Sequence, residues 1–178
     1  MQEGGNPVVF AQWRGLSKKS ILFYNHYDVQ PPEPLAEWIS PPFEPTIRNG
    51  MLFARGVADN KANLITRLLA LKSFLDEGLR PEVTLKFLVE GEEEVGSATL
   101  PNVVSKNLDL LKSDICIWES AYRDETGRPQ VILGCKGLIQ ADLVCDNLKI
   151  DMHSSRAVII PSPAARLVEA LSTMFESN

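Results

Sequence analysis

The sequence predicts an α/β fold in which a sheet is flanked by helices. The first observation is that strand-like apolar runs alternate with helix-like periodic segments between residues 7 and 135. The second is the run EVTLKFLVE at residues 82–90, which is almost continuously apolar, as in a strand buried on both faces. Hydrophobic residues make up 44% of the chain and charged residues 23%, so 178 residues suffice for one well-packed domain.

Two strands open the predicted sheet, and a proline-rich loop follows them. The strands are PVVFAQWRG (7–15) and SILFYNHYD (20–28), joined by the turn-forming residues GLSKKS. Residues 30–50 hold six prolines and therefore predict an ordered loop that is neither a helix nor a central strand. Trp38 and Phe43 either hold this loop in place or line a ligand site.

The remaining elements of the first domain follow in order. Leucines, an isoleucine and a phenylalanine at helical spacing predict a helix over residues 60–77. Asp59 or Asn60 is expected to cap its start, and Gly78 is expected to end it. A second helix is predicted over residues 98–111, and further strands are predicted at 113–120 and 130–135.

The pattern changes near residue 135 and predicts a second domain. Residues 137–155 alternate apolar and polar side chains, which indicates a strand with one face in water. An amphipathic helix is predicted after Ser162 as its N-cap, with Pro163 at the first helical position. One strand and one helix cannot bury their apolar faces alone. We therefore expect a first domain over residues 1–134 and the beginning of another over residues 135–178.

Several classes of function are disfavoured by composition. The net charge is −5 and no basic run occurs, so we expect no nucleic-acid partner. The apolar runs have the length of strands, so we expect no membrane span, and the first residues show no export signal. The three cysteines lack C-x-x-C spacing, which predicts buried free thiols in a cytoplasmic protein.

Polar side chains that can carry chemistry stand where predicted elements end or begin. His26 and Asp28 are two residues apart at a strand end, so both side chains point to one face. A carboxylate beside a histidine is typical of a metal ligand with its orienting partner. A lone His-x-Asp pair is more often a capped histidine at a surface turn. Asp59 precedes a helix, where it can cap the helix or bridge two cations.

Acidic residues crowd the end of the buried strand 82–90, and their mutual repulsion needs a compensating charge. Four of the five positions 90–94 are glutamate, and Glu119 ends another strand. Ligands of open α/β sheets bind outside the carboxyl ends of the strands. We expect one cluster there, formed by His26, Asp59, Glu93, Glu94 and Glu119. Zinc, manganese or cobalt would suit these donors, and a carboxylate that is not a ligand could be a general base. A two-carboxylate glycosidase is an alternative that leaves His26 and Asp59 without a role.

The ordered motifs NHYDVQP, W-x-x-x-PFEP-x-x-x-x-G-x-L-x-ARG-x-x-D-x-K, EGEEEVGS and DMHSS resemble one known family. It comprises the co-catalytic zinc peptidases and amidohydrolases, among them carnosinase, carboxypeptidase G, aminoacylase, acetylornithine deacetylase and succinyl-diaminopimelate desuccinylase. The long PPFEP loop resembles the dipeptidase-like branch. The resemblance implies a mixed sheet flanked by helices and the start of an α+β lid domain. It also implies two Zn²⁺ ions, a dipeptide or N-acyl amino acid substrate, and a homodimer formed through the lid.

The same resemblance implies a set of metal ligands. His26 and Glu119 would bind one metal ion, and Glu94 would bind the other. Asp59 would bridge both ions. The family binds its second ion through a further histidine near the C-terminus of the full chain, whereas this sequence has only two histidines. We therefore expect a fragment cut at both ends. The alternative to a working hydrolase is an inactive metal-binding fragment or an interaction module.

The resemblance also implies three catalytic roles. Asp28 would orient His26, and Glu93 would be the general base in the register Glu-Glu-x-Gly-Ser. His153 resembles the lid histidine that reaches across a dimer to the substrate carbonyl oxygen, and could otherwise be an exposed strand-end residue. Glu90 and Glu92 are expected to be structural or solvated. The run SSRAVIIPSP stands where the family usually has a glycine-rich segment.

Overall fold

The computed structural model of the protein describes residues 4–120, 122–146, 150, 152–156 and 158–175. These residues divide into two compact units, Met1–Val131 and Ile132–Asn178. The division lies near the domain border that the sequence pattern suggests at residue 135. That the second unit is the beginning of a lid domain stays a prediction.

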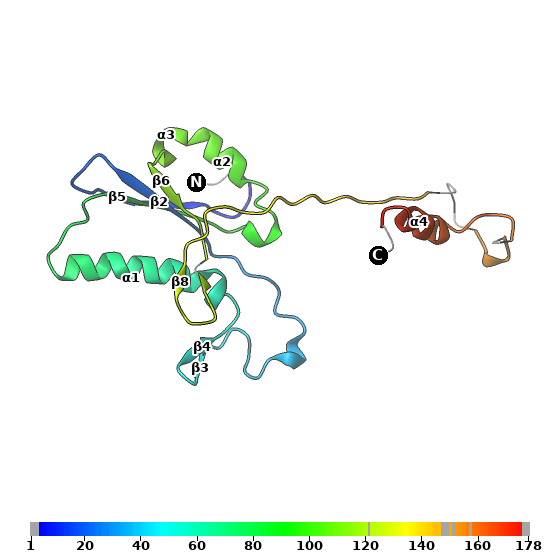
Figure 1. Cartoon of the computed structure of the whole chain (residues 1–178), viewed down its shortest axis with the longest axis horizontal. Helices are drawn as coiled ribbons and strands as arrows, with labels where there is room; N and C mark the ends of the chain where they lie inside the picture. The colour runs from blue at the N-terminus through cyan, green and yellow to red at the C-terminus, as the bar shows by residue number, and fades with distance from the viewer. Residues whose placement is uncertain (1–3, 121, 147–149, 151, 157, 176–178) are drawn as a thin grey trace. The chain divides into compact units, whose positions relative to one another are not determined.

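A four-stranded mixed sheet forms the centre of the first unit (Figure 1). In spatial order its strands are β1 (Val9–Trp13), β5 (Thr84–Glu90), β2 (Ser20–His26) and β6 (Ile115–Ile117). β1 runs antiparallel to β5, while β5, β2 and β6 are parallel to one another. The predicted mixed α/β sheet is therefore confirmed, although the first two strands do not pair with each other. β5 lies between them, and its last five residues, Lys86–Glu90, are all buried.

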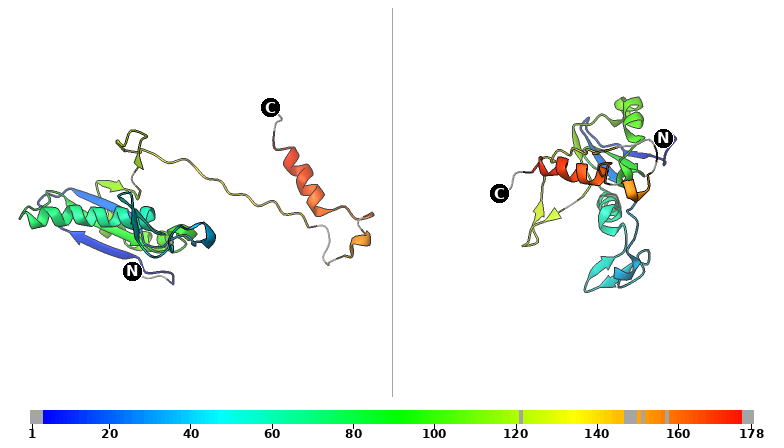
Figure 2. Two further views of the ribbon diagram at one scale, coloured as in Figure 1. Left: turned by 90° about the horizontal axis from the view of Figure 1, so that it is seen from below. Right: turned by 90° about the vertical axis from the view of Figure 1, so that its right-hand side faces the viewer.

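Helices cover both faces of this sheet. Figure 2 shows α1 (Ala62–Asp76) on one face and α2 (Leu100–Lys106) with α3 (Leu108–Leu111) on the other. The predicted helix at 98–111 is thus two short helices separated at Asn107. The hydrophobic core lies between the sheet and the helices α2 and α3. Its buried residues are Val8, Leu22, Tyr24, Leu88, Val103 and Leu111.

The start of α1 differs from the prediction in a way that matters for the site. A wide turn over Val57–Lys61 precedes the helix, and Lys61 rather than Asp59 or Asn60 stands at the N-cap position. Asp59 has extended backbone angles, φ −125° and ψ 95°, within this turn. Its carboxylate is therefore not occupied in capping the helix. Gly78 ends α1 as predicted, with φ +70°, a conformation that favours glycine.

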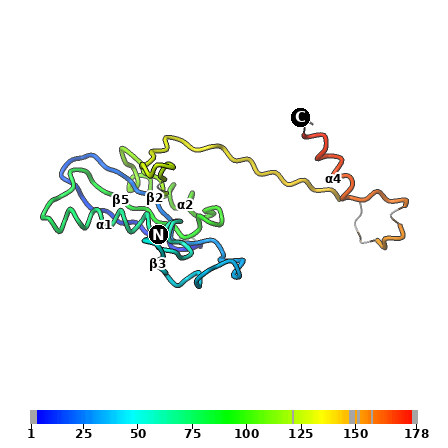
Figure 3. The backbone as a smooth tube through the Cα atoms, turned by 60° about the horizontal axis from the view of Figure 1, so that its bottom comes forward, coloured from blue at the N-terminus to red at the C-terminus, as the bar shows by residue number. Residues whose placement is uncertain are grey.

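The proline-rich segment forms a loop with a short 3-10 turn at Leu35–Glu37 and a hairpin of β3 (Thr46–Arg48) and β4 (Met51–Phe53). Figure 3 shows it reaching away from the sheet. Trp38 holds this loop: its indole N–H donates to the Pro32 carbonyl at 2.7 Å, and the Arg55 guanidinium lies 5.3 Å from its ring centre. Phe43 is exposed and does not hold the loop.

Two short strands, β7 (Tyr122–Arg123) and β8 (Pro129–Gln130), end the first unit, so the predicted strand at 130–135 forms only at its first residue. In the second unit a 3-10 turn (Ser154–Arg156) precedes α4 (Pro163–Ser172), which Ser162 caps as predicted. The strand predicted over 137–155 is absent from the described residues 137–146. A strand needs a hydrogen-bonded neighbour, and none of the described residues pairs with this segment.

Two further expectations concern side chains and membranes. The cysteines are not buried as expected: Cys116 and Cys135 are exposed, and Cys145 is partly exposed. Cys116 lies on β6. This strand is at the edge of the sheet, so one of its sides is open to solvent. Within the described part of the chain, no helix combines the length and the apolar character that crossing a membrane requires.

Candidate metal centre

His26 is the centre of the candidate site. It is the last residue of β2, pairs with Glu90 of β5, and is 1% exposed. Its Nδ1 atom lies 3.3 Å from Oδ1 of Asp28 and 3.1 Å from the Asp28 carbonyl oxygen. The opposite ring nitrogen, Nε2, points into a group of carboxylates. The ring is therefore held on one side by Asp28 and offers the other side to the cluster.

Three carboxylates come from three separate elements to face Nε2. Asp59 Oδ1 from the turn before α1 lies at 2.8 Å. Glu119 follows β6, and its Oε2 atom lies 3.1 Å from Nε2. Glu93 Oε2, from the 3-10 turn (Glu93–Val95) after β5, lies at 3.9 Å. All three approach the carboxyl end of the parallel strands, where ligands of α/β sheets bind.

Glu94 and Asp28 are linked at the other side of the cluster. The Glu94 backbone N–H donates to Asp28 Oδ2 at 2.9 Å, so one carboxylate contacts both His26 and the Glu93–Glu94 turn. Gln30 donates to the Glu94 carboxylate at 2.9 Å. The left-handed Gly96, with φ +93°, ends this turn.

Two sets of donor atoms can hold a metal ion. One set is His26, Glu93 and Glu119, and the other is His26, Asp59 and Glu94; within each set the donor atoms lie within 4.8 Å of one another. The structure therefore brings together the six residues of the first unit that were expected at the site: His26, Asp28, Asp59, Glu93, Glu94 and Glu119. Which carboxylate bridges and which one is the base stay predictions.

The surroundings of His26 favour positive charge, on the ring itself or on a bound cation. Both ring nitrogens face acceptor oxygens, those of Asp28 on one side and those of Asp59 and Glu119 on the other. A neutral imidazole carries only one N–H, so one nitrogen would direct its lone pair at oxygen atoms. In addition, Asp28 Oδ1 and Glu119 Oε2 are buried atoms without a hydrogen bond. A divalent cation with nitrogen and oxygen ligands fits this donor set.

The pKa values of Glu119, Glu93 and His26 are also shifted by burial and by the crowding of acids around His26. Burial raises the pKa of Glu119 to about 7; His26 opposes the shift, while Glu93, Asp59 and Glu90 add to it. Burial also raises the pKa of Glu93, with Glu94 among the contributing charges. For His26, burial lowers the pKa, but the hydrogen bond that its ring donates to Asp59 and the charges of Glu119 and Glu93 outweigh it and raise the pKa overall. The cluster thus favours positive charge.

Glu90 and Glu92 have structural roles, as the sequence suggested. Glu90 is buried and accepts hydrogen bonds from the Tyr24 hydroxyl and from Ser97 Oγ. Glu92 accepts from the Thr99 hydroxyl at 2.7 Å and from the Asn6 backbone at 2.8 Å, and these contacts lower its pKa. Neither side chain belongs to the two donor sets.

His153 belongs to the second unit and is exposed. Its Nδ1 atom accepts a hydrogen bond from the Ser155 backbone N–H at 3.2 Å. A neutral His153 must therefore carry its proton on Nε2, which can donate to a further group. Its role relative to the site in the first unit stays a prediction.

Three polar residues at the site escaped the sequence analysis. Asn25 and Asn60 are fully buried and joined by a hydrogen bond between their side chains, and Arg67 donates to Asn25. Asn25 and Asn60 are the chain neighbours of His26 and Asp59. The available signal was Arg67 itself, a charged residue within the otherwise apolar stretch LITRLLAL.

Comparison with known proteins places the chain in a family. A model of "Peptidase family M20/M25/M40" matches residues 22–177. The probable di- and tripeptidase DUG2 of Saccharomyces cerevisiae is 36% identical over 188 residues, which cover 98% of this chain and 21% of that protein. The Cys-Gly metallodipeptidase dug1 of Schizosaccharomyces pombe is 30% identical over 97% of this chain and 37% of its own length.

A solved structure is similar in both sequence and fold. The M20 family metallo-carboxypeptidase Sso-CP2 from Sulfolobus solfataricus superposes with a TM-score of 0.88 at 45% sequence identity. The match covers 97% of this chain and 39% of that one, so the chain spans well under half the length of these relatives. A family match over most of the chain agrees with the resemblance of its motifs. The chain belongs to peptidase family M20/M25/M40, a family of hydrolases.

Proposed function

We propose that this chain carries the metal-binding part of a hydrolase that cleaves an amide bond of a dipeptide or N-acyl amino acid. The observation that carries the proposal is the buried His26, which has acceptor oxygens at both ring nitrogens and three carboxylates within 3.9 Å of Nε2. Two of the relatives, a probable di- and tripeptidase and a Cys-Gly metallodipeptidase, support small peptides as the substrate class.

The metal ligands in this proposal are His26, Asp59, Glu94 and Glu119. Asp59 is the most exposed of the four, and its extended backbone leaves it free to bridge two ions. Zinc is the expected metal, with manganese or cobalt as alternatives, because the donors are one imidazole and several carboxylates. A divalent cation at this position would lower the pKa of a water molecule toward about 7 and polarise the amide carbonyl.

Glu93 is proposed as the general base. Its Oε2 lies 3.9 Å from His26 Nε2, which is too far for a direct hydrogen bond and leaves the carboxylate free to accept a proton. Burial and the neighbouring acids raise the pKa of the Glu93 carboxyl, while His26 opposes the shift. Glu93 would take a proton from the attacking water at Oε2 and pass it to the leaving nitrogen.

Asp28 and His153 have supporting roles in the proposal. Asp28 accepts from the Glu94 N–H and faces His26 Nδ1, so it fixes the orientation of two ligands at once. His153 would donate its Nε2–H to the carbonyl oxygen of the substrate, consistent with the Ser155 N–H contact at Nδ1. In a homodimer formed through the lid, this donor would come from the other copy.

The experiment is to measure release of free amine from a panel of dipeptides and N-acetyl amino acids, with zinc added. Glu93→Gln should leave the zinc content unchanged and lower the rate by about 10²–10⁴-fold, because the water loses its base. Glu92→Gln is the matched control, since the Glu92 carboxylate accepts from Thr99 and Asn6, lies outside both donor sets, and a glutamine keeps an acceptor oxygen.

Each result bears on one part of the proposal. Full activity of Glu93→Gln would assign the base to another residue. A wild-type protein that binds zinc tightly but hydrolyses none of the panel would favour the non-catalytic alternative, a metal-binding or interaction module. A wild-type protein that binds no zinc would overturn the metal centre itself.

A further inference from the structure

We infer that Arg67 is a positioning residue for the metal centre, because its guanidinium joins the segments that carry His26, Asp59 and Glu119. This inference rests on the proposed function, since it concerns the geometry of the same ligands. Arg67 lies on α1. Among the described residues, it donates to Tyr24, Asn25 and Trp118 and makes no hydrogen bond to a ligand side chain. Its effect would therefore pass through neighbouring residues.

The guanidinium bonds to the residues that precede two of the ligands. Its Nη1 donates to the Tyr24 carbonyl at 3.0 Å and to Asn25 Oδ1 at 2.5 Å, directly before His26 on β2. Its Nη2 donates to the Trp118 carbonyl at 2.8 Å, directly before Glu119. One planar group thus holds the ends of β2 and β6 together.

This link continues the sheet where its own hydrogen bonds stop. The ladder between β2 and β6 ends with the pair Phe23 and Ile117. Beyond it, the carbonyls of Tyr24 and Trp118 are bound by Arg67. Arg67 therefore ties the backbone shortly before His26 to the backbone directly before Glu119.

The third ligand is connected through the buried asparagines. Asn25 accepts from Arg67 and donates from Nδ2 to Asn60 Oδ1. Asn60 is fully buried and directly follows Asp59 in the turn before α1. A displacement of Asn25 would consequently move Asp59 as well as His26.

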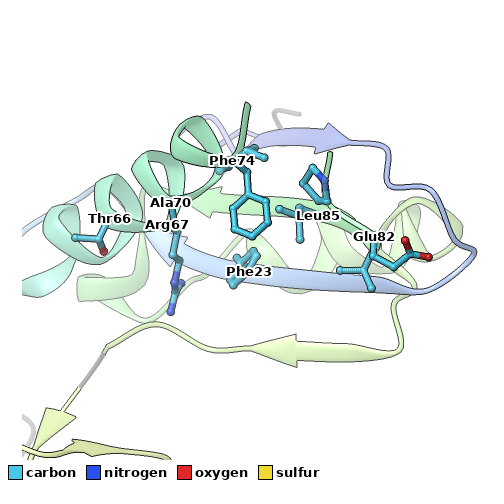
Figure 4. A pocket seen from close by; sticks show the side chains of 10 residues that line it. Phe23, Thr66, Arg67, Ala70, Phe74, Glu82 and Leu85 are labelled. Atoms are coloured by element: carbon cyan, nitrogen blue, oxygen red, sulfur yellow. The ribbon is translucent and has the colours of Figure 1, made fainter. Parts of the chain in front are cut away.

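Arginine is suited to this position by shape and charge. A guanidinium presents several N–H donors in a rigid plane, whereas a lysine ammonium is a compact charge on a flexible chain. The centre of the guanidinium also lies 5.3 Å from the centre of the Phe23 ring, and both residues line a pocket of about 560 Å³ between α1 and the sheet (Figure 4). The positive charge further opposes the repulsion among the acids.

The test compares Arg67→Met, Arg67→Lys and, as a matched control, Lys72→Met. Lys72 lies on the same helix, is exposed and pairs with Asp76, so its loss removes an equal charge away from the site. Three quantities are measured: zinc affinity by competition with a chromophoric chelator, the visible absorption spectrum of the cobalt-substituted protein, and the unfolding temperature without metal. The cobalt spectrum reports ligand geometry, which a purely structural role of Arg67 would not alter.

Arg67→Met should weaken zinc binding by about 10–100-fold and change the cobalt spectrum, as loss of an outer partner of a metal ligand does. Arg67→Lys should show a smaller loss of the same kind, and Lys72→Met should behave as wild type. If Arg67→Met does not fold, the lysine variant decides. Unchanged zinc affinity and cobalt spectrum in the variants, with only a lower unfolding temperature, would overturn the inference while leaving the metal centre intact. Absence of zinc binding in the wild type would instead overturn the proposed function.

Discussion

Two apolar segments of similar composition have opposite environments in this protein. β5 is a central strand, and Leu88 within it is 4% exposed. In residues 132–146 of the second unit, Leu138 is 92% exposed. β5 pairs with β1 on one side and β2 on the other, whereas the second segment pairs with none of the described residues. Apolar side chains are thus buried where neighbouring elements pack against them, as they do around Leu88.

The two histidines repeat this contrast in their chemistry. His26 is buried among carboxylates from three different elements. His153 is exposed, and its described contacts are with Ser155. The same imidazole is therefore a candidate ligand in one unit and a candidate hydrogen-bond donor in the other. The sheet makes the difference, because it brings distant acids to one edge.

The comparison of the apolar segments is tested most directly by Leu88→Ala and Leu138→Ala. Leu88→Ala should lower the free energy of unfolding by about 2–5 kcal/mol, because it leaves a cavity in the core around Leu22 and Val103. Leu138→Ala should change it by less than about 0.5 kcal/mol. Urea unfolding followed by tryptophan fluorescence measures both. Equal losses would show that residues 132–146 are packed in solution.

The histidine contrast gives the next largest effect. His26→Ala should weaken zinc binding by more than about 100-fold, since loss of an outer partner alone costs about 10–100-fold. His153→Ala should leave the affinity of the chain unchanged, because none of the metal-binding sets among the described residues includes it. Isothermal titration of zinc into each metal-free variant compares them. Loss of zinc binding in His153→Ala would mean that the second unit supplies a ligand.

Local sequence patterns were sufficient for several single elements because these depend on neighbouring residues. The continuous apolar run of β5, the proline-rich loop and the Gly78 stop each act within a few positions, and all three are found as predicted. Patterns failed where the outcome depends on distant partners. The alternation in 137–155 indicates a strand, but nothing along the chain shows whether a neighbouring strand exists to pair with it.

The site shows the same division between local and distant information. His26, Glu93 and Glu119 each stand at or just after the end of a predicted strand. Because the carboxyl ends of parallel strands lie at the same edge of a sheet, the sequence predicted that these residues would meet, and they do. Asp59 was expected as a helix cap or a bridge, and its extended backbone within a wide turn removes the first option. Arg67 could not be placed from sequence, since two of its acceptors lie on β2 and the third directly follows β6, all far away along the chain.

The smallest effect is expected at α4, which has no buried residue among those described and so depends on local interactions. Ser162 Oγ accepts from the Ala165 N–H at the start of this helix. Ser162→Ala should cost about 1 kcal/mol, which would reduce the helical population several-fold because a helix this short is marginal by itself. Ser172→Ala is the control: its hydroxyl only donates back to the Glu169 carbonyl, and alanine favours the helix more than serine does. Backbone carbon chemical shifts of residues 163–172 measure the population in each variant. If both variants keep the wild-type shifts while the unfolding of the first unit is also unchanged, α4 must be stabilised by contacts beyond its own cap, and the contrast between a packed and an unpacked unit would no longer hold.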